Sequence, residues 1–287
     1  MPRGRPVDGF ALEYDREGTG PAVVLLHGWP GSRADHRAVV PLLRDHAEVV
    51  VPDLRGFGGS DRFDAPPAEA YSADAQAASV LGLMEELGLD RAVLAGYDVG
   101  SRVAQAVARR RPGAVRALVL SPPLPGVGER ILAPEAQREF WYQPFHQLPL
   151  ADALVDGDER AVRAYLTHFW EHWSAPGWAL DPAHLDELVS LYARPGAFRA
   201  SIAWYRAGAG AVAHSLRERA PAPEDRVAIP ATVMWGEHEP LFPVAWSDRI
   251  GEFFAAAELR VLPGVGHFTP LEAPEAVARA ITERLTA

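Results

Sequence analysis

Three residues in this sequence are best suited to chemistry. An aspartate and a histidine each lie in a glycine-rich turn, and a glutamate lies beside a third such turn. Asp98 is the centre of the sequence GYDVG, which lies between a short apolar run and a segment with helical periodicity. The two glycines permit a sharp strand-to-helix turn that lifts the central side chain into a cleft. This spacing predicts a nucleophile elbow in which aspartate takes the place of the usual serine.

An aspartate at this position favours attack on a saturated carbon. Its carboxylate would form an ester with that carbon, and water can then release the product by attacking the carbonyl carbon of Asp98 itself. A serine would form an ether, which has no carbonyl. Asp98 needs no activating base because the reference pKa of about 3.9 leaves it ionised at neutral pH. Epoxides and alkyl halides are suitable electrophiles; the simpler alternative is a turn aspartate that satisfies backbone N–H groups.

Release of such an ester needs a base that activates water, and His267 in the sequence GVGHF is the candidate. A carboxylate must hold its tautomer. Glu239 in the sequence WGEHEP is preferred, because it lies deeper in the loop and next to a proline, and Glu237 is the competitor. The chain order Asp98, Glu239, His267 matches the nucleophile–acid–base order of α/β-hydrolases.

An anion site is predicted beside the nucleophile. The sequence HGWP at 27–30 follows the first buried apolar run. The backbone N–H groups of Trp29 and Val99 could bind the oxyanion that forms when water attacks the ester, a contribution of roughly 3–4 kcal/mol for one donor. The alternative for this stretch is a plain strand-ending turn.

The elements that must position these residues alternate along the first half of the chain and return near its end. Short apolar runs that end in turn residues predict buried parallel strands at 23–26, 49–51, 92–95, 115–120, 231–234 and 258–262. Helices are predicted at 32–43, 72–87, 99–110 and 274–285, with Ser72 and Gly88 as caps of the second. Such alternation indicates a mostly parallel central sheet flanked by helices.

The pattern is interrupted between residues 126 and 225. This stretch is helical in texture and holds half of the chain's aromatic residues between Phe140 and Tyr205. We expect a helical lid over the carboxyl ends of the strands, where ligands bind in open α/β sheets. The predicted core is therefore 1–125 and 226–287, with the lid at 126–225.

Composition excludes several classes of protein. The chain has 287 residues, no cysteine and a net charge of −10, and all its 28 positive residues are arginine. Thiolate and lysine chemistry are thereby excluded, and an acidic chain is a poor partner for nucleic acid. No apolar stretch approaches the ~18 residues of a membrane span, and the N-terminus does not read as a signal peptide. We expect a cytoplasmic enzyme without a membrane partner.

Taken together, HGWPGS, DLRGFGGSD, GYDVG, WGEHEP and GVGHF resemble the epoxide hydrolase branch of the α/β-hydrolase superfamily, whose relatives are haloalkane and haloacetate dehalogenases. The resemblance implies the α/β-hydrolase fold, no metal or organic cofactor, and two lid tyrosines that hold and protonate the epoxide oxygen. Tyr205 matches one of them, and either Trp141 or Tyr142 faces the substrate at the other. Val99 departs from the tryptophan or arginine that relatives carry there, and Arg102 matches a second arginine of haloacetate dehalogenases.

Three functions follow as expectations. The first is hydrolysis of an apolar or aromatic epoxide to a vicinal diol through a covalent Asp98 ester, with Trp29, His27, Trp141 and Arg102 as further substrate contacts. The second is dehalogenation by the same ester chemistry, with Trp29, Trp141 and Tyr142 around the halide. The third is a non-catalytic ligand-binding protein on the same fold. The sequence leaves open whether the chain is a monomer or a homodimer.

Overall fold

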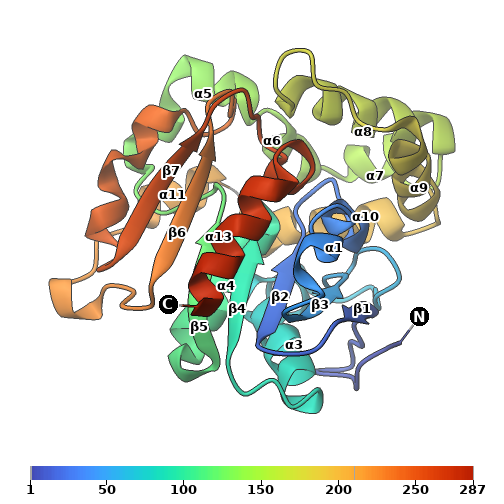
Figure 1. The fold of residues 1–287 in the computed structure, drawn as a ribbon. Helices are drawn as coiled ribbons and strands as arrows, with labels where there is room; N and C mark the ends of the chain where they lie inside the picture. The colour runs from blue at the N-terminus through green and yellow to red at the C-terminus, as the bar shows by residue number, and fades with distance from the viewer. Residues whose placement is uncertain (1, 210, 287) are drawn as a thin grey trace.

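A seven-stranded sheet forms the centre of the molecule in the computed structural model, which describes residues 2–209 and 211–286 (Figure 1). The strand order is β1-β3-β2-β4-β5-β6-β7. Every neighbouring pair is parallel except β1 and β3. The strands are β1 (Tyr14–Glu17), β2 (Ala22–Leu26), β3 (Glu48–Pro52), β4 (Ala92–Gly96), β5 (Val115–Leu120), β6 (Ala231–Gly236) and β7 (Ala257–Leu262). The predicted mostly parallel sheet is confirmed, and β1 is an antiparallel addition at its edge.

Helices cover both faces of the sheet. α1 and α13 pack together on one face and α3 and α4 on the other. Strand β2 divides its side chains between these layers, because Val23 and Leu25 belong to one buried cluster and Val24 and Leu26 to the other. The bounds are α1 (Val40–Leu43), α2 (Pro67–Ala70), α3 (Ala73–Glu86), α4 (Val99–Arg110), α12 (Thr269–Glu272) and α13 (Pro274–Thr286).

Between β5 and β6 the chain forms a helical segment, the name used below for residues 126–225. Figure 1 shows β6 and β7 pointing upward, with α7, α8 and α9 of this segment gathered above the central strands. Its division from the core at 125 and 226 stays a prediction. Its helices are α5 (Pro134–Glu139), α6 (Tyr142–His146), α7 (Pro149–Val155), α8 (Glu159–Trp173), α9 (Pro182–Tyr192), α10 (Ala197–Trp204) and α11 (Ala211–Arg217).

Among the helix predictions near the site, some are confirmed and one is wrong. Val99–Arg110 is α4 as predicted, and Ser72 caps α3 through a hydrogen bond from the Ala75 N–H to its hydroxyl. The single helix expected at 32–43 is wrong: a 3-10 turn at Arg33–His36 (η1) precedes the short α1. In η1 the Asp35 carboxylate bonds back to the Ser32 N–H, and Pro41 starts α1 anew because it has no N–H to continue a helix.

No helix in the described part of the chain is both long and apolar enough to cross a membrane.

Candidate active site

Asp98 sits on a strained turn between β4 and α4. Its backbone has φ 48° and ψ −121°, a conformation that costs energy for any residue other than glycine. Close packing imposes the turn, because a Cβ at Gly96 would lie 2.5 Å from the Gly100 carbonyl and one at Gly100 would lie 2.1 Å from the Leu26 oxygen. The glycines of GYDVG thus let strand and helix meet, and Asp98 projects from the turn at the carboxyl end of the sheet.

His267 and Glu239 lie beside Asp98. The imidazole Nδ1 is 2.6 Å from Glu239 Oε2, and Nε2 is 3.5 Å from Asp98 Oδ2. The Leu241 N–H holds the other oxygen of Glu239 at 2.9 Å. All three side chains are buried. Glu237, the competing acid, is exposed and accepts from the Gly264 N–H instead.

The two carboxylates determine the charge of His267. Burial opposes the imidazolium, but Glu239 and Asp98 on either side outweigh it and raise the pKa of His267 to about 10. The resting imidazole is therefore protonated at neutral pH and lies between two negative groups. Loss of the charge on Asp98 would remove one of these two causes and lower the pKa.

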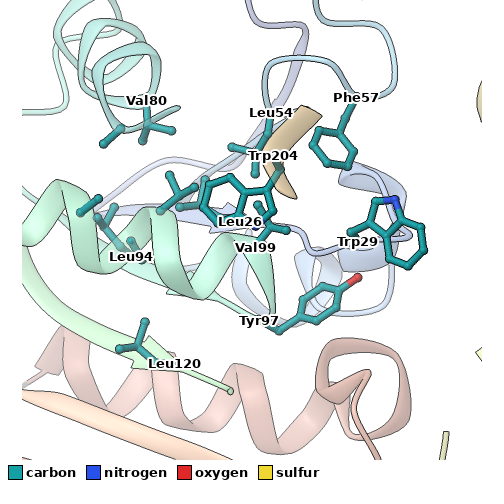
Figure 2. Packing of buried hydrophobic residues seen from close by; sticks show 14 of the residues in the cluster. Leu26, Trp29, Leu54, Phe57, Val80, Leu94, Tyr97, Val99, Leu120 and Trp204 are labelled. Carbon is teal, nitrogen blue, oxygen red and sulfur yellow. The ribbon is translucent and has the colours of Figure 1, made fainter. Parts of the chain in front are cut away.

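The Trp29 N–H donates to Asp98 Oδ1 at 2.8 Å, so one backbone donor of the predicted anion site contacts the Asp98 carboxylate. Val99, the source of the second donor, is the first residue of α4. Val99 and Trp204 line the same cavity, and Figure 2 shows Tyr97 reaching from the turn toward the loop that carries Trp29. Because the first N–H groups of a helix have no intrahelical partner, Val99 suits an anion.

A cavity of about 30 Å³, with room for one or two water molecules, opens beside Asp98. It is lined by Asp98, Val99, Arg102, Pro123, Tyr142, Gln143, Trp204, Tyr205 and Phe242. Two of these, Tyr142 and Tyr205, come from the helical segment and have ring centroids 5.5 Å apart. Burial, with the nearby Asp98 charge, raises the pKa of both hydroxyls. Both hydroxyls are therefore neutral at neutral pH, and their residues line the same cavity as Asp98.

Trp141 and His27 lie outside this cavity. Trp141, just before α6, is 42% exposed and stacks on the Phe169 ring, whereas Tyr142 is buried. His27 is fully buried, with Nδ1 bonded to the Gly28 oxygen and Nε2 accepting from the Leu54 N–H, so both nitrogens support the loop. The Trp29 indole N–H is likewise engaged, by the Ser201 hydroxyl at 3.2 Å.

Arg102 lines the cavity rather than an open helix face. One of its nitrogens lies 3.1 Å from His214 Nε2. Burial lowers the pKa of Arg102 to about 10, so it stays charged at neutral pH, and its charge is the main cause that lowers the pKa of His214 to about 4. The cavity thus holds a cation as well as the Asp98 carboxylate.

Sequence reasoning missed four lining residues: Pro123, Gln143, Trp204 and Phe242. Gln143 and Trp204 adjoin the two tyrosines in sequence, a signal that could have found them. Pro123 lies in the loop after β5 and Phe242 in the loop after β6. Neither belongs to a sequence motif that would have pointed to it. Within the described residues, no three His, Asp or Glu side chains cluster as a metal site requires.

Comparison with known proteins agrees with this architecture. A family model described as the alpha/beta hydrolase fold matches residues 21–274. The chain therefore belongs to the alpha/beta hydrolase fold family, which confirms the fold and the resemblance predicted from its motifs.

Individual relatives divide between two activities. The chain is 29% identical over 279 residues to a soluble epoxide hydrolase from Corynebacterium sp. (strain C12), covering 94% of this chain and 92% of that protein. It is 32% identical over 282 residues to a fluoroacetate dehalogenase from Burkholderia sp, covering 94% and 88%. A solved structure of an epoxide hydrolase from metagenomes of hot environments matches with TM-score 0.83 and 26% identity over 100% and 98% of the chains. The protein is thus a hydrolase similar to epoxide hydrolases and dehalogenases.

Proposed function

We propose that the protein hydrolyses an epoxide to a vicinal diol through a covalent ester on Asp98. The observation that carries this proposal is that Asp98, Tyr142 and Tyr205 line the same cavity. An epoxide needs a nucleophile at carbon and an O–H donor at oxygen, and this cavity presents both. Neither indole N–H of the alternative halide site, Trp29 or Trp141, is free in the cavity.

In the first step Asp98 Oδ2 attacks a ring carbon, because Oδ1 is held by the Trp29 N–H. The C–O bond of the ring breaks and its electron pair stays on the oxygen, which takes a proton from Tyr205 or Tyr142. Neutral phenols donate well to a developing alkoxide. The product is a 2-hydroxyalkyl ester of Asp98 and one tyrosinate.

In the second step His267 Nε2 takes a proton from water, and the hydroxide adds to the carbonyl carbon of Asp98. The resulting oxyanion forms on Oδ1, where the Trp29 and Val99 N–H groups stabilise it. Collapse breaks the bond between that carbon and Oδ2, and the diol leaves. The departing alkoxide takes its proton from the new carboxylic acid of Asp98, so the cycle ends with the Asp98 carboxylate and the protonated His267 of the resting site.

The charge of His267 fits this order of events. In the resting site the Asp98 carboxylate helps to raise the pKa of the imidazole. Ester formation removes that charge, so the pKa of His267 falls and its proton passes through solvent to the tyrosinate, which leaves a neutral imidazole when a base is required. Glu239 keeps the Nδ1 tautomer throughout, which leaves Nε2 for water.

A second candidate function is removal of halide from a small haloacid by the same ester chemistry. Arg102 favours it, because its guanidinium shares the cavity with Asp98 and could pair with a substrate carboxylate. The small cavity also suits a small substrate. An apolar or aromatic epoxide, our preferred substrate class, requires the helical segment or the lining side chains to move.

The test is a turnover assay with a matched panel of aryl and alkyl epoxides, haloacetates and haloalkanes. Diol is measured by chromatography and halide by ion-selective electrode. The proposal expects diol from at least one epoxide and loss of that activity in Asp98→Ala. Halide release from haloacetates without diol would replace the first function by the second, and no turnover across the panel would support the non-catalytic alternative.

A further inference from the structure

Asp35 is a buried carboxylate outside the cavity that joins three segments of the chain. Its side chain is fully shielded from solvent. Oδ2 accepts from the Ser32 N–H at 3.0 Å and from the Tyr97 hydroxyl at 2.5 Å. Oδ1 lies 2.9 Å from Nε2 of His184. The family resemblance gave this residue no role.

Each partner of Asp35 belongs to a part of the candidate site. Ser32 ends the loop whose Trp29 N–H binds Asp98. Tyr97 directly precedes Asp98 at the strained turn, and Figure 2 shows its hydroxyl directed toward the Trp29 loop. His184 lies in α9 of the helical segment. Asp35 therefore joins the loop, the elbow and the helices above them through one carboxylate.

The surroundings leave this carboxylate little freedom. A Cβ at Gly31 would lie 1.9 Å from Asp35 Oδ2 and 2.7 Å from the Tyr97 hydroxyl, so the loop passes directly over the pair. Tyr192 of α9 also donates to the Gly31 oxygen at 2.8 Å, which ties the same loop to the helical segment a second time. A buried carboxylate is costly without donors, and these groups supply them.

We propose that Asp35 is a positioning residue that sets the Trp29 N–H against Asp98 and so completes the oxyanion hole. The inference rests on the proposed ester mechanism and adds to it a residue that touches neither substrate nor reacting atoms. Without Asp35, the Ser32 and Tyr97 donors lose their common acceptor. The loop and the elbow are then free to shift relative to each other.

The two chemical steps depend on this placement unequally. During attack on the epoxide, negative charge leaves Asp98, and the Trp29 N–H has no developing charge to stabilise. During ester hydrolysis, a full negative charge forms on the oxygen that this N–H contacts. Because a displacement of about 1 Å can cost about 100-fold in a positioned reaction, loss of Asp35 slows the second step far more than the first.

The experiment compares Asp35→Ala, Asp35→Asn and wild type in single turnover with an epoxide substrate, following the enzyme-bound ester by rapid-quench intact mass. In Asp35→Ala we expect ester hydrolysis to slow about 30-fold, and ester formation to change less than about threefold, so that ester accumulates. Asp35→Asn keeps an oxygen for Ser32 and Tyr97 and is expected to restore both rates to within about threefold. Equal slowing of both steps, or no rescue by asparagine, overturns the proposal.

Two further variants serve as an alternative test if Asp35→Ala misfolds and as a matched control. Tyr97→Phe removes one donor and leaves the others, so it tests the same link if Asp35→Ala does not fold. It is expected to show a smaller bias in the same direction, and unbiased rates would overturn the proposal. Asp186→Asn, on the exposed side of α9, is the matched control and should leave both steps unchanged.

Hydrogen exchange of residues 27–37 separates this proposal from the proposed function. We expect about tenfold faster exchange in Asp35→Ala than in wild type and little change in Asp35→Asn. Were wild type to form no ester with any epoxide, the ester mechanism would fail, and faster loop exchange would still show that Asp35 fixes the loop. Unchanged exchange overturns the positioning role whatever the activity.

Discussion

The charged groups of the site and its hydroxyl donors are built in different ways. Asp98, Glu239 and His267 each follow the end of a parallel strand by a few residues, so the sheet brings them together. Tyr142 and Tyr205 come from the helical segment and are placed by packing, with Tyr142 stacked on the Trp29 ring at 5.7 Å and Tyr205 edge-on to it at 5.8 Å. The first group is held by backbone geometry and the second by side-chain contacts.

This difference assigns separate tasks to the two regions. In the proposed mechanism, the sheet loops provide the steps common to any ester route: attack, oxyanion binding and water activation. The same proposal gives the choice of electrophile to the helical segment and the side chains facing it, through phenol donors for an epoxide oxygen or the Arg102 cation for a carboxylate. Changes in the sheet loops should therefore abolish all activities. Changes in the second region should alter the ratio of epoxide turnover to haloacid turnover.

The largest effect is expected for Asp98→Ala. Removal of the nucleophile should reduce turnover of every substrate in the panel by at least about 1000-fold, because both steps use this carboxylate. Steady-state assays with the far-UV circular dichroism spectrum as a control for folding would measure it. Retention of more than a tenth of the wild-type rate would contradict a covalent role for Asp98.

Tyr205→Phe should slow epoxide turnover more than haloacid turnover. Loss of a proton donor to the epoxide oxygen is expected to slow ring opening by about 10- to 100-fold, with Tyr142 supplying the remainder. A haloacid, whose displacement step forms no alkoxide, should be affected less than about threefold. Tyr165→Phe is the control, since that hydroxyl contacts His146 at 3.0 Å and does not line the cavity. Equal effects of the two variants would reduce Tyr205 to a packing residue.

Arg102→Gln tests the opposite preference. If a haloacid is accepted, loss of the charged partner of its carboxylate should raise KM by about 10- to 100-fold. An uncharged epoxide should keep its KM within about threefold. An equal rise for both substrates would mean that Arg102 maintains the cavity and does not select the substrate.

A separate prediction concerns stability rather than activity, at the site beneath the elbow where His36 is buried against Tyr97. Burial lowers the pKa of His36 from 6.5 to about 4, so the folded state resists its protonation. The stabilising contribution is complete above pH 6.5 and is lost as the pH falls toward 4, by about 3 kcal/mol. Urea unfolding from pH 7 to pH 4 should show a shallower loss of stability for His36→Leu than for wild type. Parallel curves would contradict the neutral, buried imidazole.

The contrast between the two regions also explains what could be predicted from the sequence. Apolar runs and glycine spacing identified the sheet, the Asp98 turn and the loops that carry Glu239 and His267, because these depend on residues adjacent in the chain. The choice between Glu239 and Glu237 needed the loop conformation.

Side-chain placements in the helical segment depend on long-range packing, which the local sequence does not encode. Helical periodicity could not show that Trp141 turns outward and Tyr142 inward. The 32–43 prediction was wrong for a local reason, because Pro41 has no N–H to continue the helical turn of η1. Arg102 on α4 lines a cavity because the helical segment covers it, a contact that its local sequence does not encode.

The central claim, a covalent ester on Asp98, is tested most directly by trapping. In His267→Gln the first step should proceed and the second should stall for want of a base. After incubation with the panel of epoxides, haloacetates and haloalkanes, intact mass should rise by the mass of one whole epoxide, and peptide mapping should place the adduct on Asp98. An adduct on another residue, or diol formation at the wild-type rate without an adduct, would contradict the account.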